Sequence, residues 1–68
     1  MEIILVTIEG KDFYQGPDST HAHMIFCTIT AMLFTYKLSG AVTMWKMGDN
    51  YAGIVMREEW VNGVVVSK

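Results

Sequence analysis

The chain has 68 residues, of which 51% are apolar and 18% are charged, and its formal net charge is −2. This composition is too apolar for a disordered chain, and the length predicts one domain over residues 1–68 with a thin core. The five basic residues are scattered and none adjoins another, which argues against nucleic-acid binding, because such proteins gather Lys and Arg on one face.

Two strands are expected before the first loop. Residues 2–9 are apolar at both odd and even positions, so we expect them to form an interior strand of a sheet. A turn then leads into a short second strand over residues 12–15. In the loop that follows, Asp18, Ser19 and Thr20 can each cap the start of a helix.

The next segment predicts a helix from Ser19 or Thr20 to Leu38. Its length and its lack of alternation favour helix over strand, although several β-branched residues lower its intrinsic propensity. Gly40 is placed to end the helix as a left-handed cap, with Lys37 favourable in the last turn. The uncharged part of this segment is too short to span a bilayer, so we expect a core helix, with a membrane-surface helix as the alternative.

Strands return after Gly40. Residues 41–47 alternate, residues 48–50 form a hairpin turn, and residues 51–57 make the return strand. Asn62-Gly63 between β-forming residues predicts a two-residue type I′ turn. The order ββαβββ predicts an α+β fold, in which one helix packs across a small, mainly antiparallel sheet.

The predicted helix is apolar on two sides. The face expected on the sheet carries Ala22, Ile25, Ile29, Met32, Leu33 and Tyr36, with Phe26 at its edge. The opposite face carries Met24, Cys27, Ala31, Phe34 and Leu38, with His23 beside them. One small sheet can cover only the first of these faces.

Two interpretations of the second face follow. Either the hairpin over residues 60–66 folds across it, or it is a binding interface, because an exposed apolar patch commonly marks an interaction site. The second interpretation predicts a protein–protein interaction module that binds a partner protein or a second copy of itself. Such a module would be a regulator or inhibitor, of a kind that viruses also encode, and six methionines suit an adaptable apolar contact.

His21, His23 and Cys27 raise a catalytic alternative. His23 and Cys27 lie four residues apart on the helix, and a thiol beside an imidazole can form the activated nucleophile of cysteine hydrolases. The other interpretation is that Cys27 is a small apolar residue of the core. A structural zinc ion takes four ligands, so these three residues do not predict a metal site, and no motif indicates a cofactor.

The segment around these residues resembles the ribosomal-processing cysteine protease family of bacteria. The shared features are a two-strand start, Thr20-His21-Ala22, and a Cys27-Thr28-Ile29-Thr30-Ala31-Met32-Leu33 helix followed by a hairpin. By this resemblance His21 would be the base and Cys27 the nucleophile of a peptide hydrolase, or the chain would be an inactive relative. Thr20 stands where the family has glycine, and the family's acidic residue before the cysteine is absent.

The cysteine content and the N-terminus indicate a location. Cys27 is the only cysteine, so no intrachain disulfide can form, whereas small secreted domains usually carry several cysteines. The chain opens with Met1-Glu2 and lacks the basic region of a signal peptide. We therefore expect a cytoplasmic protein.

Overall fold

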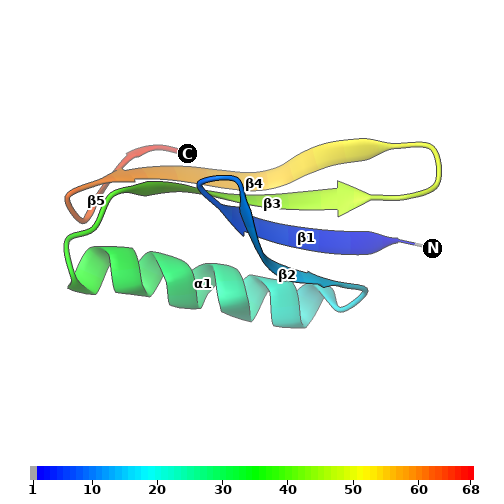
Figure 1. Cartoon of the computed structure of the whole chain (residues 1–68), viewed down its shortest axis with the longest axis horizontal. Coiled ribbons are helices and arrows are strands. Elements are labelled where there is room, and N and C mark those ends of the chain that lie inside the picture. The colour runs from blue at the N-terminus through cyan, green and yellow to red at the C-terminus, as the bar shows by residue number, and fades with distance from the viewer. Residues whose placement is uncertain (1) are drawn as a thin grey trace.

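Turn residues divide the chain into six elements, which the computed structural model describes over residues 2–68 (Figure 1). They are the strands β1 (Ile3–Ile8) and β2 (Lys11–Gly16), the helix α1 (Ser19–Thr35), and the strands β3 (Gly40–Met47), β4 (Ala52–Val61) and β5 (Val64–Ser67). The predicted α+β class and the order ββαβββ are confirmed.

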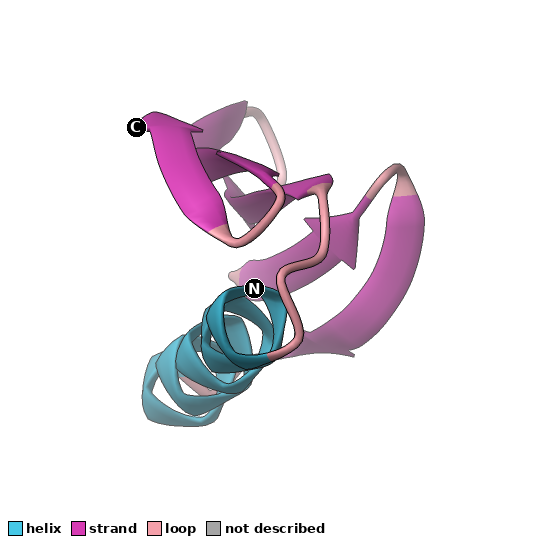
Figure 2. Ribbon diagram, turned by 90° about the vertical axis from the view of Figure 1, so that its left-hand side faces the viewer, coloured by secondary structure: helices cyan, strands magenta, loops and turns pink. Residues whose placement is uncertain are grey.

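The five strands form one antiparallel sheet in the order β2-β1-β3-β4-β5. The helix connects β2 to β3 and packs chiefly on β1, β2 and β3. β1 therefore lies inside the sheet, as its apolar faces predict. The hairpin of β4 and β5 extends the sheet beyond the helix, as the view along the helix shows (Figure 2).

Two hairpins close with two-residue turns in which both residues have positive φ. The values are 51° and 79° at Glu9 and Gly10, and 51° and 81° at Asn62 and Gly63. Positive φ at both central positions is the requirement of a type I′ turn, whose twist matches that of the flanking strands. The turn predicted at Asn62-Gly63 is therefore confirmed.

The core lies between α1 and the inner strands. Its buried apolar residues are Ile4, Val6, Val42 and Met44 from the sheet and Ala22, Phe26, Ile29 and Leu33 from the helix. The helix is turned toward Phe26, so the predicted inner face was wrong for Met32 and Tyr36, which are exposed. Burying the Phe26 ring removes a large apolar surface from water, whereas a buried Tyr36 hydroxyl would need a hydrogen-bond partner.

The helix begins as the sequence predicts. Asp18 is the N-cap residue, with an extended backbone. Its carboxylate accepts a hydrogen bond from the His21 backbone N–H at 3.1 Å, and its carbonyl accepts the first helical bond from Ala22. The cap satisfies one of the N–H groups that a helix start leaves without a partner.

The end of the helix differs from the prediction. Lys37, with φ of 54°, takes the left-handed conformation, and the Leu38 N–H donates to the Leu33 carbonyl at 2.9 Å. This six-to-one bond is the mark of a Schellman motif, so the helix ends at Thr35 and not at Leu38. Gly40, expected to be the cap, begins β3.

The turn between β4 and β5 explains where the helix ends. The Gly63 N–H donates to the Leu38 carbonyl and the Asn62 N–H donates to the Ser39 hydroxyl, each at 3.0 Å. A Cβ atom on Gly63 would lie 2.8 Å from the Lys37 Cα, so the turn and the helix end are in close backbone contact. This tertiary contact fixes the Lys37 conformation, which its side chain alone would not favour.

Candidate functional site: the outer face of the helix

Four apolar residues of α1 lie on the side of the helix opposite the buried residues, and the exposed Leu38, predicted to share this face, follows the helix end at Thr35. Met24, Cys27, Ala31, Phe34 and Leu38, called here the outer helix face, are all exposed. The exposed fraction is 64% for Met24, 67% for Phe34 and 46% for Leu38. The face that the sequence singled out is therefore open to solvent in the monomer.

The spacing of the helix residues explains why this face is opposite the core. The buried residues recur at intervals of four, three and four, and the four outer residues within the helix, Met24 to Phe34, at three, four and three. With 3.6 residues per turn, each set forms a stripe along the helix, and the two stripes lie on opposite sides. The amino-acid pattern alone thus gives the helix two apolar stripes.

The C-terminal hairpin leaves the outer helix face uncovered. Its turn contacts the helix segment only at the C-terminal end, through the bonds to Leu38 and Ser39 and the close approach of Gly63 to Lys37. The rest of β4 and β5 continues the sheet (Figures 1 and 2). The interpretation in which the hairpin shields this face does not describe the fold.

Threonines flank the outer helix face, and their hydroxyls are satisfied within the helix. The Thr28 hydroxyl donates to the Met24 carbonyl at 2.8 Å, and the Thr30 hydroxyl donates to the Cys27 carbonyl at 3.0 Å. A hydroxyl that is already bonded costs less to remove from water than one without a partner. These flanks can therefore be covered by a partner without losing their hydrogen bonds.

Charge is absent along the whole helix, because no Asp, Glu, Lys or Arg occurs in residues 19–36. The nearest charged residues are Asp18, which precedes the helix, and Lys37, which follows it. A surface of this length without charge carries no ions that a partner would have to desolvate.

Neither histidine of the catalytic hypothesis interacts with Cys27 in residues 2–68; each contacts a different residue. The His21 ring stacks on Tyr14 with 4.9 Å between ring centroids. The His23 Nδ1 bonds to the Ser19 carbonyl at 2.8 Å, which makes that nitrogen the donor. Cys27 is exposed, and within residues 2–68 no hydrogen bond joins its thiol to either histidine.

In residues 2–68 the Cys27 thiol therefore forms no hydrogen-bonded pair with either imidazole. A cysteine hydrolase requires the thiol and the imidazole within hydrogen-bond reach, with the base oriented by a third group. The helix begins at Ser19, so Cys27 lies more than two turns from the N-terminus, where the helix dipole has little effect. In the described part of the chain, no group of three His, Cys, Asp or Glu is arranged to hold a metal ion.

A second apolar surface lies on the sheet face opposite the helix, and sequence reasoning did not single it out. Strand alternation and the strand register place Ile3, Leu5, Trp45, Met47 and Ile54 there. The first four are half-buried by their neighbours in the sheet. The signal in the sequence was the apolar character of both faces of β1, together with the alternation of β3.

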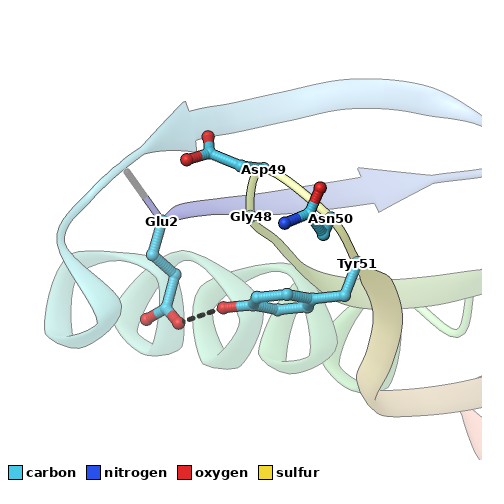
Figure 3. Close-up of a pocket in the computed structure, with 5 residues that line it drawn as sticks. All are labelled: Glu2, Gly48, Asp49, Asn50 and Tyr51. Atoms are coloured by element: carbon cyan, nitrogen blue, oxygen red, sulfur yellow. Dashed lines mark hydrogen bonds between the residues drawn. The ribbon is translucent and has the colours of Figure 1, made fainter.

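A shallow hollow of about 360 Å³ lies at the turn between β3 and β4 (Figure 3). There the Tyr51 hydroxyl donates to the Glu2 carboxylate at 2.5 Å, and the Lys46 ammonium is 3.5 Å from the same oxygen. The hydrogen bond from Tyr51, with the Lys46 charge, lowers the pKa of Glu2, and the same hydrogen bond raises the pKa of Tyr51. These contacts fasten the turn to the start of β1.

No family model matches the chain, and comparison with curated proteins and with solved structures finds no similar protein. The helix in residues 2–68 lacks the length and apolar content needed to cross a membrane.

Proposed function

We propose that this protein is a small interaction module that binds another protein chain through the outer helix face. The supporting observation is that the five apolar residues of the outer helix face are exposed and that the helix carries no charged residue. The chain also has only a small core of its own. A module of this kind acts by occupancy, as a regulator or inhibitor does, and needs no catalytic group. Large exposed apolar patches on small domains usually mark such contacts.

The size of the exposed side chains indicates which surface drives binding. A buried aromatic side chain removes about 150–250 Å² from water, so the exposed two-thirds of Phe34 offers roughly 100–170 Å². At about 25 cal/mol per Å², covering it contributes roughly 2.5–4 kcal/mol before the costs of association. The apolar residues of β1 and β3 on the open sheet face, Ile3, Leu5, Trp45 and Met47, are already half-buried, so each of them has less surface left to cover.

The open sheet face also carries more charge. Arg57 and Glu59 pair with Thr43 and Ala41 on that side of β3, and they form an ion pair at 3.4 Å. A partner that covers this part of the sheet must desolvate those ions, whereas the outer helix face has none. The exposed apolar area and the absence of charge both favour the outer helix face as the binding surface.

The test replaces one residue of the outer helix face and one matched residue elsewhere. Phe34→Asp places a charge in the proposed contact, and Phe13→Asp places the same charge at a phenylalanine of β2 that is 60% exposed. Both variants should keep the circular dichroism spectrum of the parent chain. We expect Phe34→Asp to lose at least ten-fold in affinity for a partner or for self-association, and Phe13→Asp to lose little.

Two results would count against the proposal. Equal losses for the two variants would show that the helix face has no special role. Association that survives Phe34→Asp unchanged would exclude the outer helix face as the binding surface.

A further inference from the structure

We propose that the outer edge of β4 over residues 52–58, called here the free edge, binds an extended peptide as an added antiparallel strand. The peptide is uncharged where it passes Ala52–Met56 and basic where it reaches Arg57 and Glu58. This surface is separate from the outer helix face, so the inference goes beyond the proposed function and does not rest on it.

The free edge exists because β4 is longer than the strand beside it. On its inner side β4 pairs with β3 from Ala52 to Trp60, whereas on its outer side β5 pairs only with Glu59, Trp60 and Val61. Within residues 2–68 no strand pairs with the outer side of residues 52–58, and β4 runs on past the end of β5 (Figure 1). Such an edge presents a row of backbone N–H and C=O groups on which a further strand can form.

The spacing of those backbone groups determines the chemistry of the occupant. Outward-facing N–H and C=O groups recur at every second residue of a strand, about 7 Å apart, and only another extended chain repeats its own groups at that interval. A helix bonds its backbone groups internally and cannot pair in this way. The free edge spans about 23 Å, which a peptide of about seven residues can follow from end to end.

The uncharged part of the free edge has little of the protection that edge strands normally carry. Apart from a register shift at Val55, residues 52–56 contain none of the charged residues or prolines that discourage pairing, and Ile54 and Val55 are 53% and 52% exposed. The other two edges are less open to a new strand. β2 begins with the charged pair Lys11-Asp12, and β5 has only four residues.

Gly53 supports the approach of another backbone to this edge. Its φ is not positive, and among the described residues no atom beyond its chain neighbours lies within 4 Å of the position that a Cβ would take. Neither a turn nor tight packing within residues 2–68 therefore requires glycine there. Glycine inside a strand lowers stability, and it commonly marks a place where another backbone comes close.

Charge distinguishes the two ends of the free edge. Arg57 forms an ion pair with Glu59 at 3.4 Å, so the adjacent Glu58 leaves this end with a net negative charge. Opposite charges on neighbouring strands stabilise pairing and like charges oppose it. An antiparallel peptide has its N-terminal end here, so a basic residue belongs at that end and uncharged β-forming residues follow it.

A short synthetic peptide tests whether the backbone makes the contact. The probe is acetylated Lys-Val-Thr-Val-Thr-Val-Thr with a fluorophore at its C-terminal end, and binding is followed by fluorescence anisotropy. Methyl groups on alternate backbone nitrogens leave the probe one edge that can pair, whereas a control peptide methylated on every nitrogen has none. We expect the control to bind at least ten-fold more weakly. Equal affinities would show that side chains alone make the contact and would overturn the inference.

Three matched variants locate the bound peptide. Ile54→Lys places a charge on the free edge, while Phe13→Lys and Val66→Lys place the same charge on β2 and β5, at residues that are 60% and 55% exposed. All three positions are exposed, so the circular dichroism spectrum should not change. We expect at least a ten-fold loss for Ile54→Lys and little loss for the other two. A loss confined to Phe13→Lys or Val66→Lys would assign the peptide to another edge and overturn the inference.

The position of the lysine in the peptide tests the direction of the added strand. Moving it from the N-terminal to the C-terminal end should weaken binding several-fold, because an antiparallel peptide would then carry it to the uncharged end of the free edge. Tighter binding of the peptide with its lysine at the C-terminal end would show that the strand is parallel.

Two further measurements separate this inference from the proposed function and from self-association. Phe34→Asp should leave the affinity for the probe unchanged, so loss of partner binding in that variant and loss of probe binding in Ile54→Lys can be judged independently. No binding of the probe up to about 1 mM would refute the free edge as a peptide site. A dimer of the parent chain that Ile54→Lys dissociates in sedimentation would show that a second copy occupies the edge, and it would overturn the choice of a peptide.

Discussion

Replacing Gly63 with alanine tests whether the last turn is docked on the helix end. Gly63 has φ of +81°, and a Cβ there would lie 2.8 Å from the Lys37 Cα and 3.2 Å from the Phe34 carbonyl oxygen. Those atoms belong to the backbone, so they cannot move aside as the end of a side chain can. The alanine must therefore displace the turn or the helix end.

Two other glycines separate the cost of the positive φ at Gly63 from the cost of its close contact with the helix end. Gly10 has φ of +79° with no atom within 4 Å of the position that a Cβ would take, and Gly53 has open space without a positive φ. A left-handed conformation costs a non-glycine residue about 1–2 kcal/mol, and overpacking costs about 1–3 kcal/mol. We expect losses of about 2–5 kcal/mol for Gly63→Ala, about 1–2 kcal/mol for Gly10→Ala, and within about 0.5 kcal/mol of zero for Gly53→Ala.

Urea denaturation followed by circular dichroism measures these differences, at a protein concentration low enough to avoid association. The expected loss at Gly63 is a large part of the total stability, which for a domain of this length is about 3–10 kcal/mol. Equal losses for Gly63→Ala and Gly10→Ala would refute the close contact between the turn and Lys37. A large loss for Gly53→Ala would refute the open space beside Gly53.

Three further outcomes follow from local contacts. Asp18→Ala removes the N-cap and should cost about 1 kcal/mol in urea denaturation, whereas no loss would mean that the cap contributes nothing. Tyr51→Phe should return the Glu2 pKa upward toward its usual value in an NMR titration, because the hydrogen bond that lowers it is gone. In the parent chain the lowered Glu2 pKa gives stability above the unfolded pKa that is lost as pH falls through the folded pKa. The raised Tyr51 pKa gives stability below its unfolded pKa that is lost as pH rises through the folded one. Cys27 should react with iodoacetamide in the folded chain, and His23→Ala should leave the rate unchanged, since a several-fold decrease would reveal the thiol–imidazole pair of a hydrolase.

The sequence by itself determined the features that depend on local conformation and periodicity. The order of the elements, the cap at Asp18 and the type I′ turn at Asn62-Gly63 follow from residues within a few positions of one another. The four outer residues within α1 also follow from the sequence, because residues three and four apart share a side of any helix, whereas Leu38 lies past the helix end. These residues of the candidate site could therefore be predicted from the sequence alone.

Only the tertiary structure decided what depends on distant parts of the chain. The strand order, which places β3 beside β1 and the last hairpin at the far edge, is a choice among pairings with similar local patterns. The helix turns Phe26 inward because the sheet presents Ile4, Val6 and Met44 to it, and it ends early because Gly63 docks on Lys37. The sequence also could not decide whether the hairpin covers the outer helix face. Periodicity shows which residues share a side of a helix, but it does not show which other segment packs against that side.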